Sequence, residues 1–132
     1  MHRWLRLAAS HSDIVLPTFA DEKQHFCDQD AECCARRFMA LGVKEVLVKN
    51  GAEPAYAFTP DFAGEVAAVA GIAATDPTGV GDCFNWVYLY SRLRARSVRE
   101  SLNTAHRVAS ILVQRPGALL QHDLVRVALK VE

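Results

Sequence analysis

The feature that most restricts the fold of this chain is a glycine turn placed directly before a helical pattern. It reads Gly79-Val80-Gly81-Asp82, and apolar residues at helical spacing follow from Phe84 onward. Glycine allows a tight backbone turn, and the start of a helix presents unpaired N–H groups and the positive end of the helix dipole. The segment therefore predicts an anion-binding turn at the head of a helix that runs from about Gly81 to Arg94.

Asp82 is the residue of this turn that can carry chemistry. A carboxylate does not bind phosphate, but it can accept the proton of a hydroxyl that attacks phosphate. An anion turn combined with a base is the arrangement that phosphoryl transfer needs. A simpler alternative stays open, because Asp beside a helix start is often only a cap. The turn is neither a Walker A loop, which needs a lysine after the glycines, nor a dinucleotide fingerprint, which needs a third glycine.

The rest of the chain alternates strand and helix patterns, which predicts an α/β layered domain. Short apolar or β-branched runs predict strands over 13–17, 45–49, 55–59 and, weakly, 65–69. Helical spacing predicts helices over 4–8, 30–41, 98–114 and 122–130. Thr18, followed by Asp21 and Glu22, predicts a further helix start. Without linkers, repeats or low-complexity segments, residues 1–132 are expected to form a single domain.

The composition excludes several classes of protein. A chain that is 51% hydrophobic and 23% charged is too apolar for disorder. Its 15 basic and 15 acidic residues balance, so no overall field draws it to nucleic acid or an anionic membrane. No apolar stretch reaches the ~20 residues of a membrane span, and the N-terminus lacks the apolar core of a signal peptide. We expect a cytoplasmic protein that binds neither nucleic acid nor membranes.

The cysteines do not have the spacing of a metal site. The chain has four of them, Cys27, Cys33, Cys34 and Cys83, with no C-x-x-C pair and no histidine at zinc-finger spacing. We expect buried, reduced thiols, with Cys33 and Cys34 on different sides of a helix.

The segment Asp76-Pro77-Thr78-Gly79-Val80-Gly81-Asp82 resembles the D-T-T-G-A-G-D signature of the ribokinase-like carbohydrate kinases, or PfkB family. The resemblance implies that the amides of Gly79, Val80, Gly81 and Asp82 form an anion hole for the γ-phosphate of ATP. It also implies that Asp82 is the catalytic base and that Thr78 borders the nucleotide.

Other segments resemble the family in the expected order, from about Ser12 to Ala118. Residues 13–22 are similar to the family's strand and N-x-x-E motif, with Thr18 and Asp21 in the positions that act near magnesium and phosphate. Residues 46–52 resemble the strand and turn along the nucleotide, which implies that Lys49, Asn50 and Gly51 bind ATP. Residues 106–118 resemble the helix that borders the adenine, which places His106 there. A histidine on an apolar stripe is also typical of simple packing.

The resemblance implies the C-terminal portion of a ribokinase-like three-layer α/β/α fold, so that residues 1–132 form one partial domain without the sugar-binding half and lid. Two segments look most like 2-keto-3-deoxygluconate kinases: L-P-T-F-x-D-E over residues 16–22 and V-K-N-G-A-E over residues 48–53. The implied reaction is magnesium-dependent transfer of a phosphoryl group from ATP to a hydroxymethyl of a small sugar or sugar acid. Turnover is expected to need the absent half in trans or a longer native product.

Some residues depart from the family's pattern. Pro77 replaces a threonine, and Trp86 and Val87 stand where small residues allow close packing. A tryptophan there could displace the helix behind the anion hole, and overpacking of this kind costs ~1–3 kcal/mol or more. The alternative function is an inactive, truncated remnant that acts at most as a nucleotide-binding or assembly module. Its open strand edges and apolar faces would favour association, including a homo-oligomer.

Overall fold

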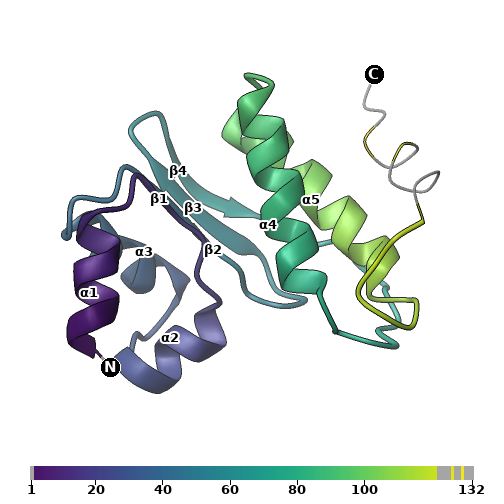
Figure 1. Ribbon diagram of the computed structural model, residues 1–132, viewed down its shortest axis with the longest axis horizontal. Coiled ribbons are helices and arrows are strands. Elements are labelled where there is room, and N and C mark those ends of the chain that lie inside the picture. The colour runs from purple at the N-terminus through teal and green to yellow at the C-terminus, as the bar shows by residue number, and fades with distance from the viewer. Residues whose placement is uncertain (1, 122–125, 127–128, 130–132) are drawn as a thin grey trace. The chain divides into compact units, whose positions relative to one another are not determined.

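The computed structural model of the chain describes residues 2–121, 126 and 129 (Figure 1). It divides into two compact units, Met1–Ala67 and Ala68–Glu132, which we call the sheet unit and the helical unit and describe separately. The sheet unit contains α1 (His2–Ser10), β1 (Ile14–Val15), α2 (Phe19–Phe26), α3 (Ala31–Met39), β2 (Glu45–Val48), β3 (Ala55–Thr59) and β4 (Phe62–Val66). The helical unit contains α4 (Val80–Leu93) and α5 (Val98–Leu112). The predicted α/β class is thus confirmed, while a single domain over residues 1–132 stays a prediction. The final predicted helix, 122–130, lies outside the described residues except at two positions.

The sheet has the order β1-β2-β3-β4. Strands β1 and β2 are parallel, whereas β2–β3 and β3–β4 are antiparallel. The strand predicted over 65–69 is displaced and covers Phe62–Val66. The cause is a tight hairpin, in which Thr59 pairs with Phe62 across Pro60 and Asp61. The Thr59 hydroxyl oxygen accepts the Phe62 N–H at 3.0 Å, so the new strand begins directly after the turn.

The core of the sheet unit forms where α3 packs against β2 and β3. Side chains alternate along a strand, so Val46 and Val48 lie on one face of β2, where they join Cys34 and Phe38 of α3. Helix α3 begins at Asp30, whose carboxylate accepts the Cys33 N–H at 2.7 Å. This cap confirms the helix predicted from the apolar spacing between Asp30 and Leu41.

Helix α1 confirms the short N-terminal helix and extends beyond the predicted residues. Trp4, Leu5 and Leu7 are exposed on it, while Ala9 is buried in the core. An apolar face of this kind supports the expectation of association, which stays a prediction. Among the described residues, no helix combines the length and apolarity needed to cross a membrane.

The helical unit is built on the packing of α4 against α5. Its buried apolar side chains are Phe84, Val87 and Tyr88 on α4, and Val98, Leu102, Ala105, Val108, Ala109 and Leu112 on α5. Both helices were predicted within about two residues of their ends. Helix α5 begins with a capping box, in which Ser97 and Glu100 bond reciprocally.

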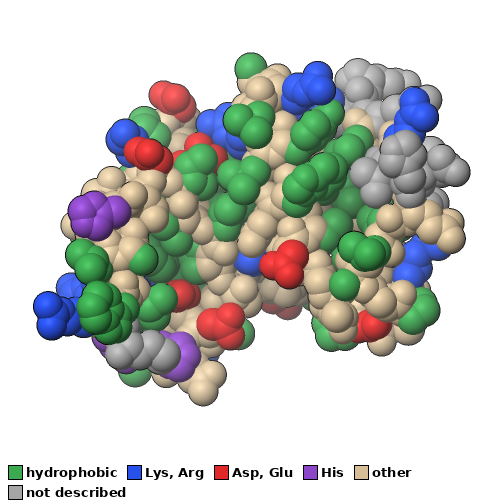
Figure 2. Space-filling view, viewed as in Figure 1, with side chains coloured by type: hydrophobic (Ala, Val, Ile, Leu, Met, Phe, Trp, Pro, Cys, Tyr) green, Lys and Arg blue, Asp and Glu red, His purple; other side chains and the backbone are tan. Residues whose placement is uncertain are grey.

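Trp86 does not crowd the packing of α4 in the helical unit, so the overpacking that could have displaced the helix is not found. Its side chain is 51% exposed and stacks on Tyr90 one turn later, with ring centroids 5.5 Å apart. The adjacent Val87 points to the other side of the helix and is fully buried. Hydrophobic side chains gather on the surface over α4 and α5 (Figure 2). The exposed large hydrophobic residues of α4 are Trp86 and Leu93.

The expectation of buried thiols is confirmed only in part. All four cysteines are free, but Cys27 and Cys33 are exposed, Cys83 is half-buried and Cys34 is buried. Cys33 and Cys34 point to different sides of α3, as predicted, and Cys27 is exposed because it caps the end of α2. Burial raises the pKa of the Cys34 thiol to about 12, and the nearby Asp28 carboxylate adds to the effect. Cys34 is therefore a packing residue and a poor nucleophile.

Candidate functional site

The glycine turn opens α4, as the sequence predicts. Gly79 is the cap residue and has a left-handed backbone conformation, with φ 71°. The Cys83 N–H donates to the Gly79 carbonyl at 2.9 Å, which is the first bond of the helical ladder. The N–H groups of Gly81 and Asp82 precede that bond and so belong to the helix end that has no carbonyl one turn back. This end can bind an anion through N–H groups and the helix dipole.

The Val80 N–H group and the Asp82 side chain have different surroundings. The Val80 N–H donates to the Pro77 carbonyl at 3.2 Å, so it closes the turn on itself. Asp82 lies in the first turn of α4 with an exposed side chain, where a base can meet an incoming hydroxyl. The assignment of these residues to phosphate binding and catalysis stays a prediction.

A second requirement fixes glycine at position 79. A Cβ atom placed there would lie 2.7 Å from the Cβ of Ala118 and 3.1 Å from its Cα. A side chain at this position would therefore combine a left-handed backbone with a direct clash. The contact also shows that the segment after α5 packs against the anion turn.

Asp76 is a residue of this turn that sequence reasoning did not assign. Its Oδ1 accepts the Thr78 N–H at 2.9 Å, and its Oδ2 accepts the Gly117 N–H at 2.8 Å. These hydrogen bonds lower the pKa of Asp76 to about 2. The Thr75 and Asp76 N–H groups both donate to the Val113 carbonyl, at 2.7 and 3.0 Å. The Asp-Pro-Thr sequence could have indicated the local Asx turn, but nothing in it pointed to Gly117.

His106 lies on α5 and is buried, with 7% of its surface exposed. Its ring meets Phe84 of α4 edge-on, with centroids 5.0 Å apart. This environment favours the packing role that the sequence left open, and an adenine contact stays a prediction.

The sheet unit brings together the other predicted site segments. Thr18 forms an isolated parallel bridge with Lys49, so the start of α2 lies beside the end of β2. The Phe19 N–H donates to the Lys49 carbonyl at 2.8 Å, and the Lys49 N–H donates to the Pro17 carbonyl at 2.9 Å. Thr18 occupies the predicted cap position, but its side chain makes no capping bond. Its carbonyl instead accepts the Asp21 N–H at 3.1 Å, and the Asp21 side chain is exposed.

The turn after β2 contains the remaining predicted nucleotide ligands. Asn50 is half-buried, and its carbonyl accepts the Glu53 N–H at 3.0 Å. Gly51 has φ 62°, a left-handed conformation that suits glycine, and its surroundings are open. The turn is thus accessible and tied through Lys49 to the start of α2.

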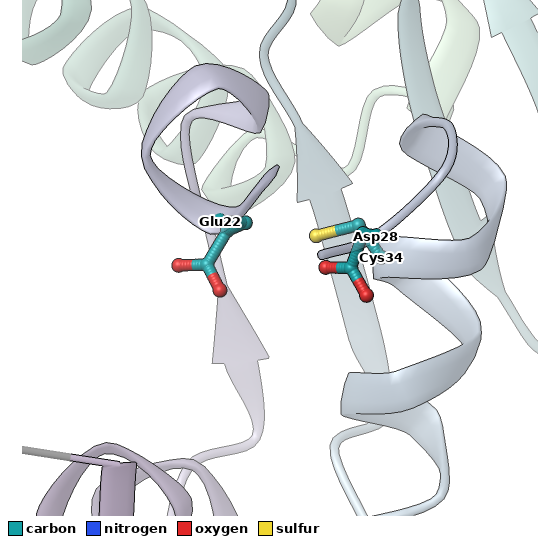
Figure 3. Close-up of side chains that lie close together, drawn as sticks. All are labelled: Glu22, Asp28 and Cys34. Atoms are coloured by element: carbon teal, nitrogen blue, oxygen red, sulfur yellow. The ribbon is translucent and has the colours of Figure 1, made fainter. Parts of the chain in front are cut away.

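A cluster of acidic groups with one thiol lies next to this region. Glu22 of α2, Asp28 of the following loop and Cys34 of α3 have their ligand atoms within 4.8 Å of one another (Figure 3). The Arg37 guanidinium already supplies a cation, since its Nη2 is 2.7 Å from Glu22 and 2.6 Å from Asp28. Burial alone would lower the pKa of Arg37, but the hydrogen bonds to Asp28 and Glu22 outweigh it and raise the pKa. The cluster is an ion-pair network that joins α2 to α3.

Comparison with known proteins identifies the family. Residues 2–123 match the pfkB family of carbohydrate kinases. The chain belongs to this family. The match covers the start of α2, the turn after β2 and the glycine turn before α4, which are the three segments described above.

The curated relatives of the chain include two 2-dehydro-3-deoxygluconokinases. The chain is 30% identical over 111 residues to the 2-dehydro-3-deoxygluconokinase of Haemophilus influenzae, covering 82% of this chain and 35% of the relative. It is 31% identical over 120 residues to that of Escherichia coli K12, covering 85% and 37%. The chain thus spans about a third of the length of these relatives.

Solved structures confirm the ribokinase-like fold. A putative ribokinase II from Escherichia coli, in complex with ATP and Mg²⁺, matches with a TM-score of 0.77 and 26% identity. The match covers 89% of this chain and 38% of the ribokinase chain. A ribokinase from Thermotoga maritima matches with a TM-score of 0.79 and 25% identity. This match covers 96% of the present chain and 45% of the ribokinase chain. The chain therefore has the fold of part of a ribokinase-like protein.

Proposed function

We propose that this chain is the nucleotide-binding part of an ATP-dependent kinase that phosphorylates a hydroxymethyl of a small sugar or sugar acid. The observation that supports this proposal most directly is the left-handed Gly79 cap, which places Asp82 in the first turn of α4 in a member of a carbohydrate kinase family. The same turn presents helix N–H groups, which suit a phosphate group. Base and anion site thus lie within four consecutive residues.

The proposed reaction follows from these positions. Asp82 accepts the proton of the acceptor hydroxyl while the hydroxyl oxygen forms a bond to the γ-phosphorus of ATP. The bond between that phosphorus and the bridging oxygen breaks, and ADP leaves with the bond's electron pair. The amides of Gly79, Gly81 and Asp82 would stabilise charge on the transferred phosphoryl group. The N–H of Val80, the fourth predicted member, donates to the Pro77 carbonyl instead. Thr78 precedes them on the exposed side of the turn.

The sheet unit offers groups that fit magnesium and nucleotide. Asp21 presents an exposed carboxylate in the first turn of α2, and carboxylate oxygen is a preferred ligand of Mg²⁺. When bound, the ion neutralises charge on the phosphate oxygens. Lys49, Asn50 and Gly51 would contact the nucleotide, which is supported by the accessible turn beside the start of α2.

The proposed acceptor is 2-dehydro-3-deoxygluconate or a similar sugar acid. The support is that the Haemophilus influenzae and Escherichia coli relatives are 2-dehydro-3-deoxygluconokinases. Since the chain spans about a third of those proteins, we propose the acceptor for the complete enzyme unit, which includes a sugar-binding part.

The proposal is tested by calorimetric titration of the purified chain with ATP and Mg²⁺. Asp82→Asn is expected to retain binding, because it keeps the shape of the site. Gly81→Val is expected to abolish binding, because a branched side chain at the second position of α4 covers the N–H groups. Glu65→Gln, on the exposed face of β4, is the matched carboxylate control and should bind like the wild type. A folded, monodisperse wild-type chain that binds no ATP would refute the proposal.

A turnover assay separates the kinase from a binding module. ADP release is measured with 2-dehydro-3-deoxygluconate as acceptor, with and without a separately expressed N-terminal part of a relative. The kinase predicts turnover that Asp82→Asn removes. A nucleotide-binding or assembly module predicts ATP binding without turnover, and its function would be indifferent to Asp82→Asn.

A further inference from the structure

The Asp76 carboxylate connects the anion turn to the segment that follows α5. One oxygen accepts the Thr78 N–H at 2.9 Å, and the other accepts the Gly117 N–H at 2.8 Å. These two amides are 39 residues apart in sequence, so a single side chain joins the two segments. Pro77, between Asp76 and Thr78, fixes its own φ and removes an N–H that could compete for the carboxylate.

The joined segments are in close contact at the cap of α4. A Cβ on Gly79 would lie 2.7 Å from that of Ala118, the residue after Gly117. A shift of the turn relative to Gly117 would therefore move Gly79 and change the direction of the N–H groups behind it. We propose that Asp76 is a positioning residue for phosphate binding, which holds the Gly79–Asp82 amides in place by bonding Thr78 and Gly117 at once. The inference rests on the proposed function.

The charge of Asp76 and its positioning role predict opposite changes in ATP affinity when the charge is removed. A carboxylate near a bound triphosphate repels it, so removing the charge should strengthen ATP binding if charge alone matters. If Asp76 acts by positioning, the neutral isostere should weaken binding, because an amide NH₂ cannot accept a hydrogen bond from a backbone N–H. Asp76→Asn therefore separates the two effects by direction.

Glu100 provides a matched control in the same unit. Its carboxylate accepts the Ser97 N–H at 2.9 Å and the Ser97 hydroxyl at 2.6 Å at the opposite end of α5. These bonds lower the pKa of Glu100, as those to Thr78 and Gly117 lower that of Asp76. Glu100→Gln thus removes a comparable carboxylate–backbone bond far along α5 from the anion turn.

The experiment measures ATP·Mg²⁺ affinity and amide hydrogen exchange for the wild type, Asp76→Asn and Glu100→Gln. Asp76→Asn is expected to weaken affinity about tenfold or more, as for loss of a charged hydrogen bond, and to speed exchange at Thr78 and Gly117 without nucleotide. Glu100→Gln should keep affinity within about twofold and speed exchange only near Ser97.

The outcomes distinguish this inference from the proposed function. If the wild type binds ATP, then unchanged or tighter binding by Asp76→Asn overturns the positioning role. Equal weakening by both variants, in proportion to their loss of stability, also overturns it. A wild type that binds no ATP refutes the proposed function, and the positioning role falls with it even if Thr78 and Gly117 exchange slowly.

Discussion

The two units use carboxylates to fix neighbouring segments in different ways. In the sheet unit, Glu22 and Asp28 hold the half-buried Arg37 guanidinium, which also contacts the rings of Phe26 and Phe38. In the helical unit, Asp76 holds only backbone N–H groups, at the surface of a turn. The first arrangement joins two helices through side chains, whereas the second fixes the course of the main chain.

The difference separates stability from site geometry. Removing one partner of a buried ion pair leaves an uncompensated charge and is costly. A surface carboxylate that accepts hydrogen bonds from backbone N–H groups contributes less to the free energy of unfolding, but it sets the direction in which those N–H groups point. We therefore expect changes at Arg37 to affect mainly stability and changes at Asp76 to affect mainly ligand binding.

The largest effect on stability is expected from Arg37→Met. Glu22 and Asp28 would lose their shared cation, and we expect a loss of about 3 kcal/mol, at the lower end for buried pairs because Arg37 is partly exposed. Urea unfolding measures the loss. The adjacent Arg36→Met is the control, because its pair with Glu32 is exposed on the same helix and should give no measurable change. Equal losses in the two variants would show that the cluster is not the connection between α2 and α3.

Gly79→Ala is expected to have the next largest effect. It forces a side chain into a left-handed backbone and against Ala118, which should cost about 2 kcal/mol or more and weaken ATP binding. Gly71→Ala is the matched control, since Gly71 has a similar φ of 72° but open surroundings. That control should cost about 1 kcal/mol from backbone strain alone. Thermal unfolding compares the two, and equal costs would mean that the Ala118 contact yields without penalty.

The next smaller effect is expected in the dependence of the free energy of unfolding on pH at low pH. The pKa of Asp76 is about 2 in the folded chain and near ~4 in an unfolded one, so folding favours the ionised form. Its contribution is complete above pH ~4 and is lost as the pH falls through about 2. Asp76→Asn should flatten the decline in stability between these values, measured by urea unfolding at several pH values. An unchanged slope in Asp76→Asn would show that another carboxylate controls this range.

The sequence predicted the local parts of the candidate site well. Two glycines before a helical pattern are sufficient to predict a tight turn and a helix start, and the structure has a left-handed Gly79 followed by a helix from Val80. The strand that ends at Val48 and the helix capped by Thr18 follow equally from apolar runs and turn residues. Local backbone preferences decide these features, so a single segment contains the information.

Long-range features could not be predicted in this way. The Asp76–Gly117 bond and the network of Arg37 with Glu22 depend on which segments meet after folding. Nothing in the surrounding residues marks Gly117 as a donor for a distant carboxylate. The strand at Phe62–Val66 was displaced in the prediction for a related reason, because its start is set by cross-strand pairing with β3.

The smallest effect is expected from Trp86→Ala, which tests a family departure that looked severe in the sequence. The exposed ring stacks only on Tyr90 among the aromatic contacts of the described residues, so its removal should cost less than about 1 kcal/mol. Val87→Ala, one residue later on the buried side of α4, should cost about 2 kcal/mol although it removes far fewer atoms. Chemical unfolding of the two variants gives the comparison directly. A larger loss from Trp86→Ala would mean that the ring packs against a surface in solution, and the outer side of α4 would then have to be treated as an interface.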